Sequence, residues 1–328
     1  MAYTIEAEGL RKAYGQLPVL TGLDLRVEPG SVFALLGPNG AGKTTTVRIL
    51  STIIAPDGGS AEVLGYDVVR DAAAIRYGIG LAGQNAAVDP SLTGRENLRL
   101  IGRLTHLPKS KVAPRAGELL EQFGLSGAGD RTVRTYSGGM RRRLDLAAAL
   151  VHRPPVLFLD EPTTGLDPHG RRELWDMLRE LVADGTTVLL TTQYLEEADR
   201  LADRVAVIDG GQVIALDTPA ALKSKLGATV IEMGWPTDDE AQQAETLAAQ
   251  LLGRRLEREG SMVRIASDDG PHVLVEVLPA LEAKRLAPKT LAVREPSLDD
   301  VFLALTGRHA EGTQPDGPAV SAVRGGNR

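Results

Sequence analysis

Hydrophobic and polar positions divide the chain into segments with different periods. From residue 3 to about residue 35, apolar and polar residues alternate in short runs such as YTIEAEGL, which predicts strands separated by turns. Residues 43–54 carry apolar residues at helical spacing. After a loop-rich stretch, a helical pattern covers about 95–150, with breaks predicted at Pro108, Pro114 and Gly124. The first half of the chain is therefore predicted to hold a β-rich segment followed by a helical subdomain.

The second half returns to apolar strands that alternate with amphipathic helices. Between residues 155 and 226, the runs VLFLD, TVLLTT and RVAVIDGG are separated by helical patterns, which is typical of a parallel sheet with crossover helices. Residues 227–307 alternate short strands with helices and predict a small α+β accessory domain, whose topology the pattern leaves open. Residues 308–328 lack periodicity and are rich in Gly and Pro, so we expect a disordered tail. The prediction is an α/β domain over residues 3–226 with a small C-terminal appendage.

Composition limits the partners and the compartment. The 328 residues suffice for one large domain and a smaller one, and the net charge of −6 gives no sign of a nucleic-acid-binding surface. The absence of cysteine excludes a disulfide framework and fits a reducing compartment. The first residues alternate like a strand and lack a signal-peptide core, and no apolar run approaches the roughly 20 residues of a membrane helix. We therefore expect a cytoplasmic protein, and any membrane spans that its work requires must belong to another chain.

The strongest chemical signal is FALLGPNGAGKTTTVRIL, in which an apolar strand leads into a glycine-rich loop and a helix. The loop matches the phosphate-binding pattern G-x-x-x-x-G-K-[ST], whose backbone amides surround a phosphate while the helix N-terminus favours the anion. Lys43 is predicted to reach the β- and γ-phosphates, and the Thr44 hydroxyl to bind Mg²⁺. A glycine-rich turn that binds nothing is the alternative, which strand, loop and helix together disfavour. The predicted phosphate-binding residues are Gly37, Pro38, Asn39, Gly40, Ala41, Gly42, Lys43, Thr44 and Thr45.

A second motif supplies acidic groups. In PPVLFLDEP an apolar strand ends at Asp160, which is predicted to hold Mg²⁺ through water, and Glu161 follows, which can orient or deprotonate the attacking water. Two adjacent acids at the end of a buried strand are seldom there for packing, because an unpaired carboxylate is costly to desolvate. A purely structural acidic pair remains the alternative for this motif alone. Phosphate loop and acidic pair together predict phosphoryl-transfer chemistry.

A third motif, TYSGGMRRRLDLAAAL, places Ser137, Gly138 and Gly139 directly before a long helical pattern, so the chain has a second helix N-terminus suited to a phosphate. Taken alone, SGG before a helix equally fits a capped turn. In register with the other two motifs, the sequence resembles the ATP-binding-cassette (ABC) ATPases, whose signature LSGGQ is seen here as YSGGM. The resemblance covers residues 3 to about 226 and implies a P-loop NTPase fold with an antiparallel β subdomain and a helical subdomain. The basic triplet 141–143 is predicted to form a solvated or interface face of the signature helix.

The resemblance assigns roles to further positions. Tyr14, in KAYG, matches the aromatic residue that stacks on adenine, although an early tyrosine taken alone is more often plain core. Gln84 matches the loop glutamine that ligates Mg²⁺ and senses the transport partner. Asp167, in TTGLDP, matches the loop that crosses the dimer interface. The ligands that these positions imply are ATP and Mg²⁺.

One position departs from the family pattern. Where the family has a histidine that contacts the γ-phosphate, the segment TTQYLEEAD has Gln193, at the end of a predicted strand. This segment, and REPSLDDVFLALTG near the C-terminus, are similar to the drug-exporter branch typified by daunorubicin/doxorubicin resistance ATP-binding proteins. A glutamine amide can donate to a phosphate oxygen but cannot become positively charged as histidine can. Gln193 is therefore predicted to be catalytic together with Lys43 and Glu161; a slow or degenerate site is the alternative.

The function implied by the resemblance requires two kinds of partner. ATP would be sandwiched in a head-to-tail homodimer, with the phosphate loop of one protomer facing the signature of its mate. A separate multi-spanning membrane permease would carry the cargo, a hydrophobic or amphiphilic drug or antibiotic of anthracycline-like character, with this chain at the cytoplasmic face of the membrane. The alternative is a soluble ABC-type ATPase that acts on ribosomes or DNA, a class that usually has two cassettes in one chain or long coiled-coil insertions. This chain has neither feature, so transport is favoured and no nucleic-acid partner is expected.

Overall fold

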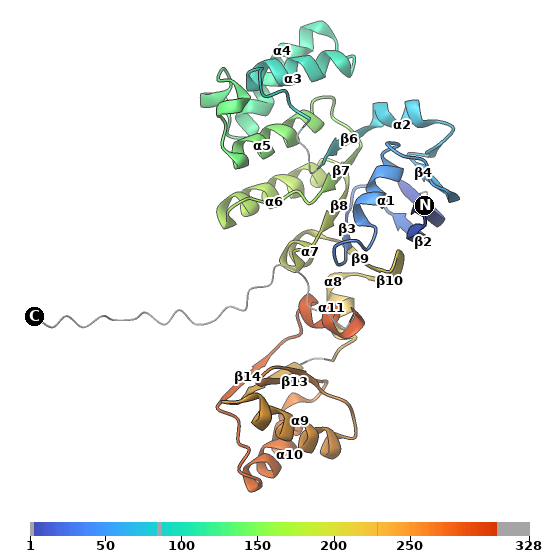
Figure 1. Ribbon diagram of the computed structural model, residues 1–328. Coiled ribbons are helices and arrows are strands. Elements are labelled where there is room, and N and C mark those ends of the chain that lie inside the picture. The colour runs from blue at the N-terminus through green and yellow to red at the C-terminus, as the bar shows by residue number, and fades with distance from the viewer. Residues whose placement is uncertain (1–2, 84–86, 228, 307–328) are drawn as a thin grey trace, which may run out of the picture.

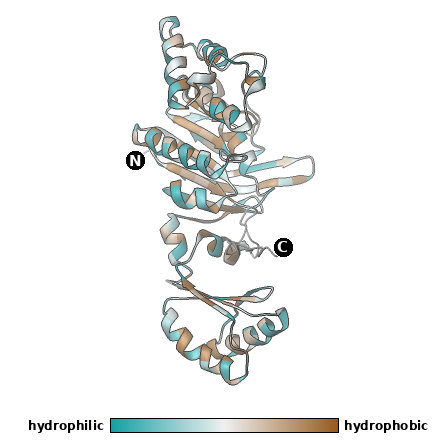
Figure 2. Ribbon diagram, turned by 90° about the vertical axis from the view of Figure 1, so that its left-hand side faces the viewer, coloured by the Kyte–Doolittle hydropathy of each residue, from teal (hydrophilic) through white to brown (hydrophobic). Residues whose placement is uncertain are grey.

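The computed structural model describes residues 3–83, 87–227 and 229–306, and within them three β-sheets organise the chain. Figure 1 shows a helical block, a central α/β part and a C-terminal α+β part. Figure 2 shows apolar strands inside the central part and hydrophilic residues along its helices. Across the described ranges, no helix combines the length and apolar character needed to cross a membrane.

The first sheet is antiparallel, with the strand order β2-β1-β4-β5. Ile5, Ala7 and Leu25 are buried while intervening residues face outward, which is the alternation of a sheet with one covered face. The buried side chains share a core with Phe33 and Leu189 of the central sheet. The strands of this β subdomain are β1 (Ile5–Tyr14), β2 (Leu17–Val27), β4 (Gly58–Val63) and β5 (Tyr66–Asp67).

The central sheet has the order β10-β9-β3-β8-β7-β6, in which only β10 runs antiparallel to its neighbour. Every residue of β3, β7 and β8 is buried, as expected of parallel strands covered on both faces. Parallel strands bring their carboxyl ends to one edge, where α/β folds bind ligands. The strands are β3 (Val32–Leu36), β6 (Ile79–Ala82), β7 (Val156–Asp160), β8 (Thr187–Thr192), β9 (Arg204–Asp209) and β10 (Gln212–Asp217).

Helices cover this sheet and form the helical block. Those of the central part are α1 (Lys43–Leu50), α2 (Ala72–Gly78), α6 (Pro168–Ala183), α7 (Leu195–Leu201) and α8 (Pro219–Ser224). The block consists of α3 (Gly94–Leu104), α4 (Lys109–Gln122), α5 (Gly138–Ala149) and two short 3₁₀ turns, η1 (Ser126–Ala128) and η2 (Val133–Thr135).

The break predicted at Pro114 was wrong, because α4 continues through this residue. Proline removes one backbone hydrogen bond from a helix and usually bends or ends it. Here Val112, Ala116, Leu119 and Leu120 lie on one face of α4 and are buried in the block, so tertiary packing keeps the helix continuous.

The C-terminal part has the order β12-β13-β11-β14, with antiparallel pairing throughout. Combined with the chain order β-α-β-β-α-β, this is the ferredoxin-like arrangement, which the sequence pattern left open. The elements are β11 (Thr229–Gly234), α9 (Asp238–Leu252), β12 (Glu257–Glu259), β13 (Met262–Ser267), α10 (Gly270–Ala283) and β14 (Thr290–Arg294). A core of its own, which includes Ile231, Val263 and Leu281, lies between the sheet and the two helices.

The last helix, α11 (Leu298–Thr306), returns to the central part, where it contacts α7 and α8 (Figure 1). Leu298, Val301 and Phe302 of α11 share a core with Leu201 and Leu222. The division at residues 226 and 227 therefore stays a prediction, and the predicted tail at 308–328 lies outside the described residues.

Candidate functional site

Predicted site residues from three neighbouring strands meet at the carboxyl edge of the central sheet. The last residues of β3 and β8 pair with each other, and Asp160 at the end of β7 pairs with Thr191 of β8. Gly37, Glu161 and Gln193 are the residues that directly follow these three strands. The sheet register therefore gathers the phosphate loop, the acidic pair and Gln193, which are far apart in the sequence.

The phosphate loop adopts a backbone that requires glycine at two positions. Gly40 has φ +83° and Gly42 has φ +108°, a region that residues with a side chain seldom adopt. A Cβ at Gly42 would also lie 2.6 Å from a methyl of Leu20 in β2. The phosphate-binding pattern includes Gly42, and the structure shows that this glycine also lets the loop pack against the β subdomain.

Lys43 begins α1 and is almost fully buried. Its ammonium donates to the carbonyl oxygens of Gly37 at 2.6 Å and Pro38 at 3.1 Å. These two bonds hold the positive charge at the loop. A dianionic phosphate is a stronger partner for this ammonium than two neutral carbonyls.

Thr44 and Asp160 are brought into direct contact. The Thr44 hydroxyl donates to Asp160 Oδ1 at 3.1 Å, and the Thr191 hydroxyl donates to the same oxygen at 2.5 Å. Asp160 is buried while Thr44 remains partly exposed. A hydroxyl and a carboxylate therefore converge at the start of α1, which is the donor set that a hard cation takes.

Glu161 directly follows this buried carboxylate and is partly exposed. Its φ of +50° is unusual for a residue with a side chain, and such conformations cluster at functional sites. The Glu161 amide donates to both the carbonyl and the hydroxyl of Thr191, each at 3.1 Å. Its carboxylate accepts from the Thr164 hydroxyl at 3.3 Å, so its orientation is defined by the loop that follows it.

Gln193 lies between β8 and α7 and is partly exposed. The Tyr194 amide donates to the Thr192 hydroxyl at 2.9 Å, and the Arg171 guanidinium lies 4.3 Å from the centre of the Tyr194 ring. Both contacts fix the backbone beside Gln193. Within the described residues, the Gln193 amide itself makes no hydrogen bond, so it is free to contact a ligand.

The SGG motif begins a helix in the helical block. Ser137 is the N-cap of α5, and its hydroxyl accepts from the Met140 amide at 3.2 Å. Ser137 and Gly138 are exposed, and Gly139 is partly exposed. Figure 1 shows α5 in the helical block, apart from α1 in the central part.

Comparison with known proteins identifies the family. The ABC transporter family matches residues 20–164. A daunorubicin resistance ATP-binding protein of Streptomyces coeruleorubidus is 52% identical over 95% of this chain and 98% of its own length. A Nod factor export ATP-binding protein of Ralstonia nicotianae is 42% identical over 93% of this chain and 94% of its own length. The chain belongs to the ATP-binding subunits of ABC transporters.

Solved structures agree with this assignment of the ABC subunit. The ATP-binding subunit of an ABC transporter aligns with a TM-score of 0.63 at 28% identity, over 68% of this chain and 92% of that one. A dimeric ATP-binding cassette in a post-hydrolysis state, with ADP and phosphate, aligns with a TM-score of 0.61 at 24% identity, over 65% and 98%. The prediction of a P-loop ABC ATPase fold is confirmed. The chain is accordingly an ATPase whose hydrolysis is coupled to transport.

The remaining predicted positions of the ABC subunit have varied surroundings. Tyr14 ends β1 with 46% of its surface exposed, so it is not part of the core. Asp167 is the N-cap of α6, where its carboxylate accepts from the Gly170 amide at 2.9 Å. Gln84 lies outside the described residues.

Sequence reasoning missed three charged groups behind this edge. The triplet 141–143 was predicted to be a solvated or interface face, yet the Arg142 side chain is only 12% exposed, and Asp145 one turn later is buried. Glu197 of α7 is fully buried, and this burial raises its pKa to about 7. A single sequence cannot separate these side chains from exposed neighbours of the same type, because each lies in a charged, helical pattern.

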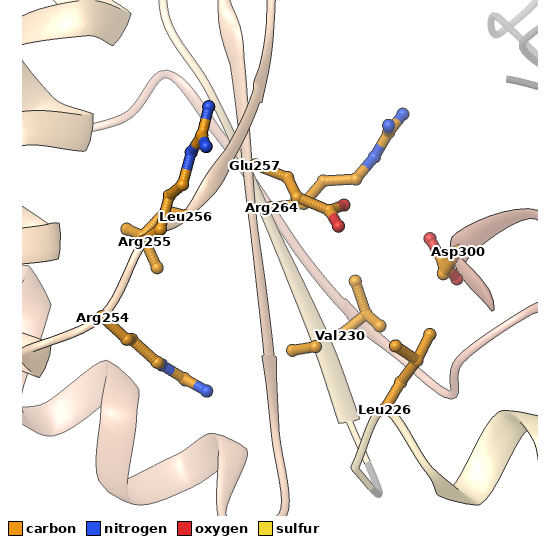
Figure 3. Close-up of a pocket in the computed structure, with 9 residues that line it drawn as sticks. Leu226, Val230, Arg254, Arg255, Leu256, Glu257, Arg264 and Asp300 are labelled. Atoms are coloured by element: carbon orange, nitrogen blue, oxygen red, sulfur yellow. The ribbon is translucent and has the colours of Figure 1, made fainter. Parts of the chain in front are cut away.

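Among the described residues, three cavities lie away from the strand-end edge, and one of about 430 Å³ is lined by residues that include Pro108, Arg115 and Val151. Another, of about 100 Å³, lies in the C-terminal part, where Arg254, Leu256 and Val230 border it; Figure 3 shows the Arg254 side chain extending toward Val230. This volume is well below the roughly 300 Å³ of the smallest usual ligand pockets, so it does not fit a nucleotide. The third, of about 320 Å³, is lined by residues that include Tyr77, Leu104 and His152, where the helical block meets α2.

Proposed function

We propose that this ABC subunit hydrolyses ATP to drive export of a hydrophobic or amphiphilic drug of anthracycline-like character through a separate membrane subunit. The observation that carries the proposal is the 52% identity to a daunorubicin resistance protein over 95% of the chain. Another relative, 48% identical, is a daunorubicin/doxorubicin resistance ATP-binding protein. The Nod factor export relative has a different cargo in its name, so the drug class must be tested directly. No feature of residues 3–83, 87–227 and 229–306 favours a soluble ATPase that acts on ribosomes or DNA.

The nucleotide site is proposed to be completed by a second copy of the chain. Lys43, Glu161 and Gln193 belong to the strand-end edge, whereas Ser137 and Gly138 are exposed at the start of α5 in the helical block. An exposed helix N-terminus with unpaired amides suits a phosphate supplied from outside the protomer. A head-to-tail homodimer would pair the edge of one protomer with α5 of its mate and create two equivalent sites.

The proposed metal is Mg²⁺, and the donor set supports it. The Thr44 hydroxyl and the Asp160 carboxylate are 3.1 Å apart, and oxygen donors with one carboxylate are what Mg²⁺ prefers beside substrate phosphates. When bound, Mg²⁺ would neutralise charge on the β- and γ-phosphates. Gln84 is proposed as a further ligand by resemblance only.

The residues of the chain divide the chemistry among them. Lys43 would exchange its two loop carbonyls for phosphate oxygens, which its buried position keeps within reach. The Glu161 carboxylate would accept a proton from, or orient, the water that attacks the γ-phosphate. The Gln193 amide would donate to a γ-phosphate oxygen without carrying charge, so this contact would not titrate near neutral pH as a histidine would.

The membrane subunit is proposed to dock between α2 and the helical block. Tyr77 is 63% exposed and Leu104 is 67% exposed, and both line the cavity of about 320 Å³. Leu100, one turn before Leu104 on α3, is 42% exposed. Large apolar side chains gathered at a hollow mark an interaction site, and a short amphipathic segment of the membrane subunit fits its size.

Drug accumulation tests the proposed cargo. In the native host, the chromosomal copy is replaced by the Glu161→Gln variant, and intracellular daunorubicin is measured by its fluorescence. We expect the variant to accumulate more daunorubicin than wild type, because binding without turnover cannot drive export. A tagged chain purified from gently solubilised cells should carry a stoichiometric multi-spanning protein. Equal accumulation in both strains would refute the anthracycline cargo, and ribosomal proteins or DNA-repair factors in place of a membrane protein would refute export itself.

A further inference from the structure

Arg142 of the signature helix α5 contacts the backbone of the acidic pair. Its side chain is 12% exposed, and its guanidinium donates to the carbonyl oxygens of Asp160 at 3.1 Å, Glu161 at 3.0 Å and Pro162 at 2.9 Å. These three carbonyls are consecutive and surround the residue whose φ is +50°. One side chain from the helical block therefore holds the strained peptide that orients the Glu161 carboxylate.

The same guanidinium reaches the segment that leads to Gln84. Arg142 Nη1 donates to the Gly83 carbonyl oxygen at 2.5 Å. On the other side of the undescribed residues, the Ala87 amide donates to Asp145 Oδ1 at 2.6 Å. Asp145 lies one turn after Arg142 on α5. The two side chains thus hold both described flanks of the loop, one through a carbonyl and the other through an amide.

Arg142 and Asp145 also depend on each other. Their nearest charged atoms are 3.6 Å apart, and the Asp145 side chain is 1% exposed. Burial lowers the pKa of Arg142 and raises the pKa of Asp145, and each charge opposes this effect on the other. A buried charge without its partner is strongly unfavourable, so the pair acts as a unit.

We propose that Arg142, supported by Asp145, is a positioning residue for ATP hydrolysis, which fixes the peptide around Glu161 relative to the two flanks of the Gln84 loop. The inference rests on the catalytic role proposed for Glu161. The planar guanidinium of arginine has five N–H donors and can donate to four carbonyl oxygens at once, whereas the lysine ammonium lacks this geometry. Movement of the loop flanks is thereby transmitted to the Glu161 backbone through a single side chain. A purely structural role for the pair would affect stability and leave the catalytic step of the folded protein unchanged.

Steady-state kinetics of the purified full-length chain tests this inference. Arg142→Lys retains the charge that Asp145 needs but loses the fork. We expect kcat to fall about 10- to 100-fold, since small displacements of a catalytic group cost this much, while the affinity for a non-hydrolysable ATP analogue changes less than about threefold. The kcat of Arg142→Gln should fall further, because glutamine can donate to fewer carbonyl oxygens and carries no charge. Arg26→Lys is the matched control, because Arg26 is exposed on β2 and pairs with Glu6 at the surface, so this variant should leave kcat within about twofold of wild type.

The outcomes separate positioning from folding and from the role of Glu161. A folded Arg142→Lys variant, judged by circular dichroism and thermal midpoint, with wild-type kcat would overturn the inference. If neither Arg142 variant folds, Arg142 is a stability residue, and the inference is equally overturned. Glu161→Gln is assayed in parallel. If Glu161→Gln retains turnover, the proposed role of Glu161 as the general base is refuted. If Glu161→Gln loses turnover while Arg142→Lys has a normal kcat, only the positioning role of Arg142 is refuted.

Discussion

Ionisation of Glu197 should make the stability of the ABC subunit depend on pH. This side chain is fully buried in α7, and its Oε1 accepts from Trp175 Nε1 at 3.3 Å. Desolvation raises its pKa from 4.5 to about 7, although nearby hydrogen bonds and the Arg171 charge oppose the rise. Because a pKa change of one corresponds to about 1.4 kcal/mol, this rise corresponds to about 3 kcal/mol of free energy between the folded and unfolded states.

The sign of the effect follows from proton binding. The folded chain holds the Glu197 proton more tightly than the unfolded chain, which releases it above its ordinary pKa of 4.5. The stabilisation is therefore fully present below pH 4.5 and is lost as the pH rises through about 7. Glu197→Gln replaces the carboxyl with an amide of the same shape that does not titrate. Relative to this variant, wild type should lose roughly 2 to 3 kcal/mol of unfolding free energy between about pH 5 and pH 8.

Urea unfolding measured by tryptophan fluorescence provides the assay. The chain has 2 tryptophans, and adding Trp235→Phe to wild type and to each variant leaves Trp175, which contacts Glu197, as the reporter. Glu196→Gln is the control, because this neighbour is exposed and pairs with Arg200 at the surface. The unfolding free energy of Glu196→Gln should depend on pH in the same way as that of wild type. If wild type and Glu197→Gln differ by a constant amount across the range, Glu197 ionises normally and the reasoning is refuted.

Two substitutions at the strand-end edge address the chemical step. Glu161→Gln should bind ATP with near-normal affinity while kcat falls by roughly 100-fold or more; substantial residual hydrolysis would exclude Glu161 as the group that activates water. Gln193→Ala should lower kcat roughly 10- to 100-fold, because one donor to the γ-phosphate is lost. Gln193→His should restore much of this activity and add a pH dependence near the pKa of histidine. Unchanged hydrolysis in the alanine variant would make Gln193 a junction residue only.

The parts of the site that could be predicted are those encoded by short local patterns. The strand, glycine loop and helix around Lys43 are consecutive in the sequence, and positive φ values explain two of the glycines. The buried runs that end at Asp160 and next to Gln193 predicted two strands of one parallel sheet. Because parallel strands share one carboxyl edge, their convergence with the loop followed from the fold class alone.

The parts that could not be predicted depend on contacts between distant segments. The break expected at Pro114 is overridden by the buried face of α4, which only the folded block provides. The ferredoxin-like strand order is set by pairing across the C-terminal part, and helical periodicity carries no information about it. Arg142 belongs to a basic triplet, and only the approach of Gly83 and the acidic strand distinguishes it from Arg141.

The distribution of buried charge points to the same edge as the motifs do. Among the described residues, the buried charged side chains are Lys43, Asp145, Asp160, Glu197 and Asp300. Four of these five side chains lie at the strand-end edge or in the helices that directly support it. The exception is Asp300 of α11, which pairs with Arg294 of β14 at 2.6 Å. Removing a charge from water is costly, so a fold retains such groups where a fixed orientation compensates for the cost. Lys43 is predicted to contact the nucleotide and Asp160 to hold its Mg²⁺, whereas Asp145 accepts from the Ala87 amide and Glu197 from the Trp175 side chain. We therefore infer that Asp145, through Arg142, helps to hold the acidic pair in place, so its neutral isostere should alter turnover more than it alters nucleotide binding.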